Sequence, residues 1–84
     1  MTSTRISHIP KVTKAMTSQI GERLQILKGD RSQHQWAKEL GIPQQTLSRY
    51  LDGSAPHAHF FVHLGRREPV NLNWLMLGEG RMRR

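Results

Sequence analysis

The sequence predicts an all-α fold, a bundle of about five short helices that contains a helix-turn-helix. Apolar residues recur at helical spacing in successive segments, no alternating β-branched run competes with them, and Gly, Pro or Asn residues separate the segments. The 84 residues give room for one domain with a small core. No run approaches the ~18 apolar residues of a membrane span, so we expect no membrane partner.

Residues 18–28 are expected to form the first helix. Three apolar residues share one face of it: Ile20, Leu24 and Leu27. Residues 1–17 mix Thr, Ser, Lys and His with a Pro and have no sustained period, so we expect a flexible basic N-terminal arm there. The domain is then expected to span residues 18–80, followed by a basic C-terminal tail over 81–84.

Two more helices are expected close together, over residues 33–40 and 44–51. Ser32 followed by Gln35 has the form of a capping box, in which the serine oxygen accepts from a first-turn N–H and the glutamine reaches back. The apolar positions of each helix fall on one face: Trp36, Ala37 and Leu40, then Leu47, Tyr50 and Leu51. The outer face of the second of these helices is polar but mostly uncharged.

The last two helices are shorter or less regular. A fourth is expected from Pro56 to Leu64 or Arg66, before a proline that prevents continuation. Its apolar residues include Phe60, Val62 and Leu64. Asn71 can cap a fifth helix over residues 72–77, which a glycine ends.

Residues 33–51 match the helix-turn-helix pattern, two short helices joined by a Gly-containing turn. Small Ala37 lies where the helices cross, since a larger side chain would push them apart. Gly41 suits the left-handed backbone at a helix end, and Pro43 can open the next helix. On the pattern alone, a Gln-rich outer face is as consistent with a solvated surface as with DNA binding.

Two separated stretches resemble a known family. SQHQWAKELGIPQQTLSRYLDG is similar to the Ser-Gln…Ala…Leu-Gly…Leu-Ser…Leu-x-Gly run of the lambda repressor and Cro-like helix-turn-helix proteins. VNLNWLMLGEG resembles the C-terminal Trp-Leu-Leu-x-Gly-Glu-Gly signature of its phage repressors of the CI type. The resemblance covers roughly residues 20–80. The chain departs from it at Pro43, where the family usually has a serine cap.

The resemblance implies a phage-type transcriptional repressor that binds a double-stranded DNA operator in sequence-specific fashion, without a cofactor. In such proteins the second helix of the motif enters the major groove. Four residues are then expected to contact bases: Gln44, Gln45, Thr46 and Arg49. Glutamine can pair with adenine, arginine with guanine and the threonine methyl with thymine. Three residues are expected to contact the DNA backbone: Gln33, Lys38 and Ser48.

The resemblance also implies a homodimer, formed in solution or only on DNA, on a two-fold symmetric operator. Its expected location is the bacterial cytoplasm, at the nucleoid. CI-type repressors often carry a second, C-terminal domain for oligomerisation and self-cleavage. The chain is therefore either a piece of a longer repressor or a short regulator.

Several alternatives remain open from the residues. Arg49 could simply pair with Asp52 on its own helix. The molecule could be an antitoxin that binds a toxin protein as well as DNA, or a protein-interaction module without a DNA role. The latter would use Trp74 and the apolar residues after it, which are equally consistent with core or with a dimer contact.

Neither an enzyme nor a metal site is expected. The six acidic residues are scattered, no Gly-rich phosphate loop is present, and the absence of Cys excludes a disulfide framework and a thiol nucleophile. His59 and His63 share a helical face near His57, but no carboxylate or Cys follows to complete a tetrahedral metal site.

The net charge of +7 is concentrated at the two ends. Six basic residues lie there: Arg5, Lys11, Lys14, Arg81, Arg83 and Arg84. Residues 16–80 hold seven basic and six acidic residues, a net charge of only +1. The ends therefore favour a polyanionic partner, or are simply solvated, and the charge says little about the folded part.

Overall fold

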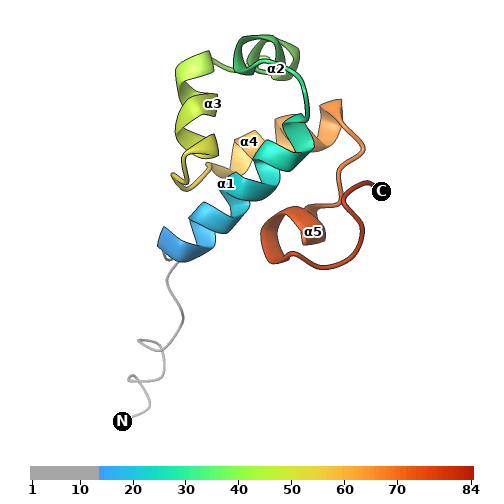
Figure 1. The fold of residues 1–84 in the computed structure, drawn as a ribbon. Coiled ribbons are helices and arrows are strands. Elements are labelled where there is room, and N and C mark those ends of the chain that lie inside the picture. The colour runs from blue at the N-terminus through green and yellow to red at the C-terminus, as the bar shows by residue number, and fades with distance from the viewer. Residues whose placement is uncertain (1–13) are drawn as a thin grey trace.

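Five α-helices, with no strand among residues 14–84, form the computed structural model, which describes those residues (Figure 1). The helices are α1 (Lys14–Lys28), α2 (Gln33–Leu40), α3 (Gln44–Leu51), α4 (Ala58–Arg67) and α5 (Leu72–Leu77). The all-α class predicted from helical periodicity is confirmed. The bounds of α2, α3 and α5 agree with the predicted ones. Within the described residues, no helix has the length and apolarity to cross a bilayer.

The longest helix, α1, runs through the middle of the fold (Figure 1). It packs against α3 and against α5, while α2 packs against α3 and α4. All five helices contribute to one core, whose largest enclosed side chains include Leu24, Trp36, Leu47, Phe60, Leu64 and Leu75. Burying each contributes about 1.5–3 kcal/mol, so the predicted inner faces supply the stability that fixes α2 and α3.

The first helix begins four residues before its predicted start, at Lys14. Thr17 is buried in the structure. Because threonine is polar, the apolar period of the sequence did not reveal that the helix includes this residue. Ala15 and Met16 favour helix, which extends the segment toward the N-terminus. The predicted boundary of the arm at residue 17 is therefore wrong, and residues 1–13 of that arm lie outside the described part.

The fourth helix begins two residues later than predicted. His57 is its N-cap and is still extended, with φ −75° and ψ 155°, so the helix starts at Ala58. It ends at Arg67, beyond the predicted end. Phe60 and Leu64 are buried, but Val62 points away from the core and is 52% exposed.

The predicted helix caps are largely confirmed. Ser32 accepts a hydrogen bond from the backbone N–H of Gln35 at 3.0 Å, and Asn71 accepts one from that of Asn73 at 3.0 Å. The second half of the capping box is wrong, because the Gln35 side chain donates to Glu39 instead of reaching back. In a capping box the glutamine oxygen would accept from the Ser32 N–H, whereas here the glutamine amide N–H donates to an ionised carboxylate, which makes a stronger hydrogen bond.

The C-terminal residues 81–84, predicted as a tail, pair with the segment before α5. The backbone N–H of Asn71 donates to the Met82 carbonyl at 2.8 Å, and that of Arg84 donates to the Pro69 carbonyl at 2.7 Å. The Met82 side chain packs against the core. The arginine-rich composition predicted a solvated tail. The pairing could not be predicted, because a single backbone bridge has no sequence pattern of its own.

Candidate nucleic-acid interface

The turn between α2 and α3 is short and tightly hydrogen-bonded. Gly41 has φ +75°, and its N–H donates to the carbonyl of Lys38 at 3.2 Å. The N–H of Ile42 donates to the Ala37 carbonyl at 3.0 Å. Gly41 thus has the left-handed backbone that the sequence predicted, at no steric cost. These bonds fix the direction in which α3 leaves α2.

The third helix begins at Pro43 without a side-chain cap. Pro43 is the N-cap, with φ −63° and ψ 143°, and it makes no side-chain hydrogen bond. The usual serine of the resembled family would supply such a bond. The fixed proline φ instead holds the chain in the geometry that enters the helix.

One face of α3 is buried and the other is polar and accessible. Leu47, Tyr50 and Leu51 are buried in the core. The predicted base-contacting residues Gln44, Gln45 and Arg49 are exposed, while Thr46 is half-buried at the flank. Gln45 and Arg49 lie one turn apart and therefore share a face. The outer face presents two amides and one guanidinium.

Arg49 has no partner among residues 14–84. Every ion pair in that part of the chain involves Arg31, so the alternative pairing of Arg49 with Asp52 does not occur. Its guanidinium makes no hydrogen bond there either, and its five donors remain accessible. An unpaired arginine and two exposed glutamines are side chains that can read base edges.

The three residues predicted to contact the DNA backbone lie on α2 and α3. Lys38 is exposed on α2, Gln33 is half-buried in the first turn of α2, and Ser48 is half-buried on α3. The structure brings Lys38 and Gln44 together, because both line a hollow of about 440 Å³ between the two helices. His34 lines the same hollow and was missed by sequence reasoning. Its spacing of four residues from Lys38 was the available signal.

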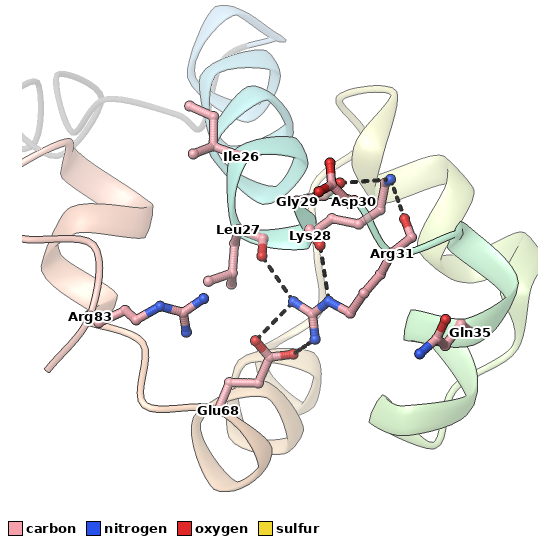
Figure 2. Close-up of a pocket in the computed structure, with 9 residues that line it drawn as sticks. All are labelled: Ile26, Leu27, Lys28, Gly29, Asp30, Arg31, Gln35, Glu68 and Arg83. Atoms are coloured by element: carbon pink, nitrogen blue, oxygen red, sulfur yellow. Dashed lines mark hydrogen bonds and ion pairs between the residues drawn. The ribbon is translucent and has the colours of Figure 1, made fainter.

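Arg31 anchors α2 to the rest of the fold, and sequence reasoning gave it no role. Figure 2 shows its guanidinium between the end of α1 and Glu68. It donates to the carbonyls of Leu27 and Lys28, both at 2.9 Å, where α1 leaves acceptors unpaired. It also pairs with Glu68 at 2.9 Å and Glu39 at 3.1 Å.

The same cluster includes Trp36 of α2. The Trp36 indole N–H donates to Glu68, and the Arg31 guanidinium lies 5.0 Å from the centre of the indole ring. Burial lowers the pKa of the Arg31 guanidinium, but the hydrogen bonds and charges of Glu68 and Glu39 outweigh burial and raise that pKa above its ordinary value. Arg31 therefore stays charged and joins α1, α2 and the end of α4.

Helices α2 and α3 form a helix-turn-helix with a buried inner face and an exposed polar outer face, and one family model matches the chain. The model of the bacteriophage CI repressor helix-turn-helix domain matches residues 15–83. The chain belongs to this family. Neither the search of curated proteins nor the search of solved structures gives a match.

Membership of the CI repressor helix-turn-helix family confirms the resemblance found in the sequence. The match extends beyond the expected residues 20–80 at both ends. It includes the early turns of α1 and most of the C-terminal segment that pairs with residues 69–71. Both segments are thus part of the family domain, and the family is one of DNA-binding helix-turn-helix repressors.

The three histidines of α4 and its cap do not converge on one point. The rings of His57 and His59 are stacked, with centres 5.7 Å apart and planes 6° apart. Those of His59 and His63 are nearly perpendicular, with centres 6.3 Å apart. Parallel rings direct their in-plane nitrogens along separate lines. Across residues 14–84, no three His, Cys, Asp or Glu side chains gather in a metal-binding arrangement.

Proposed function

We propose that this chain binds double-stranded DNA in sequence-specific fashion and acts as a phage-type repressor by occupying an operator. The observation that carries the proposal is the outer face of α3, where Gln44, Gln45 and Arg49 are exposed and Arg49 is unpaired. A helix of this kind fits the major groove of B-DNA, which is about 12 Å wide. Family membership supports the same class of function.

The proposed division of labour follows the chemistry of the side chains. Gln44 and Gln45 pair with adenine edges, Arg49 pairs with guanine, and Thr46 contacts a thymine methyl through its accessible side. Each good bidentate pair contributes about 1–3 kcal/mol of discrimination between bases. The backbone contacts we propose, which position α3 over its site, come from Gln33, Lys38 and Ser48.

Selection of bound duplexes from a randomised DNA library, at about physiological salt, tests the proposal. We expect a two-fold symmetric motif whose half-sites lie about one helical turn apart. Enrichment of no motif, with only weak and salt-sensitive binding, would contradict sequence-specific recognition.

Two substitutions test whether α3 reads the bases. Gln44→Ala combined with Arg49→Ala should abolish binding to the selected operator, because both side chains face outward. The melting temperature should stay unchanged, since exposed substitutions alter stability by only about ±0.5 kcal/mol. Retained operator binding by this variant would mean that the recognition surface lies elsewhere.

We further propose a homodimer on the operator, in the bacterial cytoplasm, formed through the exposed face of α5. Leu75 is fully buried and half-buried Trp74 packs against the core, which assigns these two residues to the fold. Leu72, Met76 and Leu77 remain 38%, 46% and 60% exposed. Adjacent apolar side chains at this exposure fit a second copy of the same helix.

Met76→Lys combined with Leu77→Lys tests this face by placing two charges at the proposed contact. Sedimentation of the protein with a two-half-site operator should show two chains per duplex for the natural sequence and one for the variant. Two chains bound by both proteins, with equal affinity, would exclude α5 as the contact.

A further inference from the structure

The hollow between α2 and α3 carries two basic side chains beside the first residue of α3. His34 and Lys38 line it from α2, and Gln44 lines it from α3. Its floor is Ala37 and Ile42, and its volume is about 440 Å³. Four residues separate His34 from Lys38, so both side chains project from one helix face. The space accommodates a phosphate with several hydrating waters, each of which takes ~30 Å³.

Among residues 14–84, no acidic side chain lines this hollow. The acid of α2, Glu39, is engaged elsewhere by Arg31 and Gln35. Asp30, before α2, lines the separate hollow of Figure 2. Within residues 14–84, neither the His34 ring nor the Lys38 ammonium has a protein partner, so their charges are available to a ligand.

The helices that pack on α2 bring no further charge into the hollow. From α3 only Gln44 reaches it, and Arg49 lies at the other end of that helix. From α4, Arg67 donates to the Glu39 carbonyl at 2.8 Å and does not line the hollow. The ring of His63 of α4 meets the His59 ring edge-on and does not line the hollow either. Among residues 14–84, Lys38 is therefore the one charged group that shares the hollow with His34.

We propose that His34 and Lys38 together seat a phosphate of the DNA backbone in this hollow, so that affinity for DNA rises as pH falls. The inference rests on the proposed function. It adds His34 as a residue that contacts DNA and pH as a condition that regulates the affinity for DNA. Imidazole gains a proton between pH 8 and pH 5 and then becomes a cationic donor. A protonated imidazole and the Lys38 ammonium together attract a phosphate more strongly than the ammonium alone does. Protonation of His34 and phosphate binding thus strengthen each other.

Because the hollow lies beside the start of α3, the phosphate contact also affects how α3 reads the bases. Gln44 lines the hollow and is also the first proposed base-reading residue. A phosphate held by His34 and Lys38 fixes the DNA backbone next to the N-terminal end of α3. Phosphate contacts of this kind set the register in which the base-reading side chains meet the groove.

DNA affinity measured over a salt series at pH 5.5 and pH 8.0 tests the inference, with the operator from the library selection as the probe. For the natural sequence we expect about tenfold tighter binding at pH 5.5, the effect of one charge-assisted contact. The gain should shrink as salt is raised, because salt screens the charge that the protonated imidazole adds beside the phosphate.

Three variants assign the effect to His34. His34→Gln should bind with the weaker affinity at both pH values. His34→Lys should keep the tighter affinity at both, because its charge does not change in this range. His59→Gln is the matched control, an exposed histidine on α4 outside the hollow, and should keep the pH dependence of the natural sequence. Circular dichroism at both pH values verifies that each variant is folded.

Equal affinities at both pH values in the natural sequence would overturn the inference and leave the proposed function standing. A pH effect that survives in His34→Gln, or one that disappears in His59→Gln, would also overturn it. Absence of sequence-specific binding at both pH values would instead contradict the proposed function itself.

Discussion

Arg31 and Glu68 show how a single pair of side chains can hold a motif in place. The side chain of Glu68 is 10% exposed and accepts from both Arg31 and the Trp36 indole. The second acidic partner of Arg31 is Glu39, whose side chain is 44% exposed. Water screens the contact with Glu39 far more than the contact with Glu68. Of the two ion pairs of Arg31, the one with Glu68 should therefore stabilise the fold more.

Glu68→Ala should lower the free energy of unfolding by about 2 kcal/mol, because it leaves the Arg31 charge and the indole N–H without their enclosed acceptor. Glu39→Ala removes the other partner of the same arginine and should cost less than about 1 kcal/mol. Urea denaturation of both variants measures the difference. Equal losses would mean that Glu68 is no better shielded from water than Glu39.

At the scale of the elements, α1 approaches the backbone of α3 closely at Gly21. A Cβ at Gly21 would lie 2.9 Å from the Tyr50 carbonyl oxygen and 3.0 Å from that of Leu51. Only glycine leaves room for these backbone atoms. Because Gly21 stands in the middle of α1, sequence alone shows a poor helix former and not the reason for it.

Gly21→Ala should lower stability by about 1–2 kcal/mol, since the cost of separating α1 from α3 exceeds the gain in helix propensity. Gly65 in α4 is the matched control, because a Cβ there meets nothing within 4 Å. Gly65→Ala should raise stability by about 0.5–1 kcal/mol. Thermal unfolding separates the two signs, and a stabilising Gly21→Ala would show that the crossing adjusts without cost.

At the scale of the whole molecule, the basic C-terminal end is part of the fold. Residues 81–84 are held by backbone hydrogen bonds to residues 69–71. In Figure 1 this C-terminal end lies by α5, across α1 from α3. Two of the three basic residues at the N-terminal end, Arg5 and Lys11, precede the described residues.

Removal of residues 1–13 deletes Arg5 and Lys11 and keeps Lys14 with α1. If both cations contact phosphates, the slope of log affinity against log salt should become shallower by ~1.8. The matched control removes the same charge from the C-terminal segment, by Arg81→Ala with Arg83→Ala, and should leave the slope unchanged. Equal slopes before and after removal of residues 1–13 would exclude a role for that arm on DNA.

The sequence by itself determined the number of helices, the bounds of three of them, the turn at Gly41 and the family. These features depend on local causes: helical periodicity, left-handed glycine and side-chain caps act within a few residues. The sequence also predicted which face of α3 is buried and which is exposed, because burial follows the same helical period.

Only the tertiary structure decided the features that join distant parts of the chain. The Arg31–Glu68 pair spans 37 residues, Gly21 meets the end of α3, and residues 81–84 pair with the segment before α5. The hollow that joins His34 to Gln44 likewise depends on how α2 and α3 cross. Such contacts follow from the relative placement of packed helices, and placement is set by the whole core at once, which no local pattern in the sequence records.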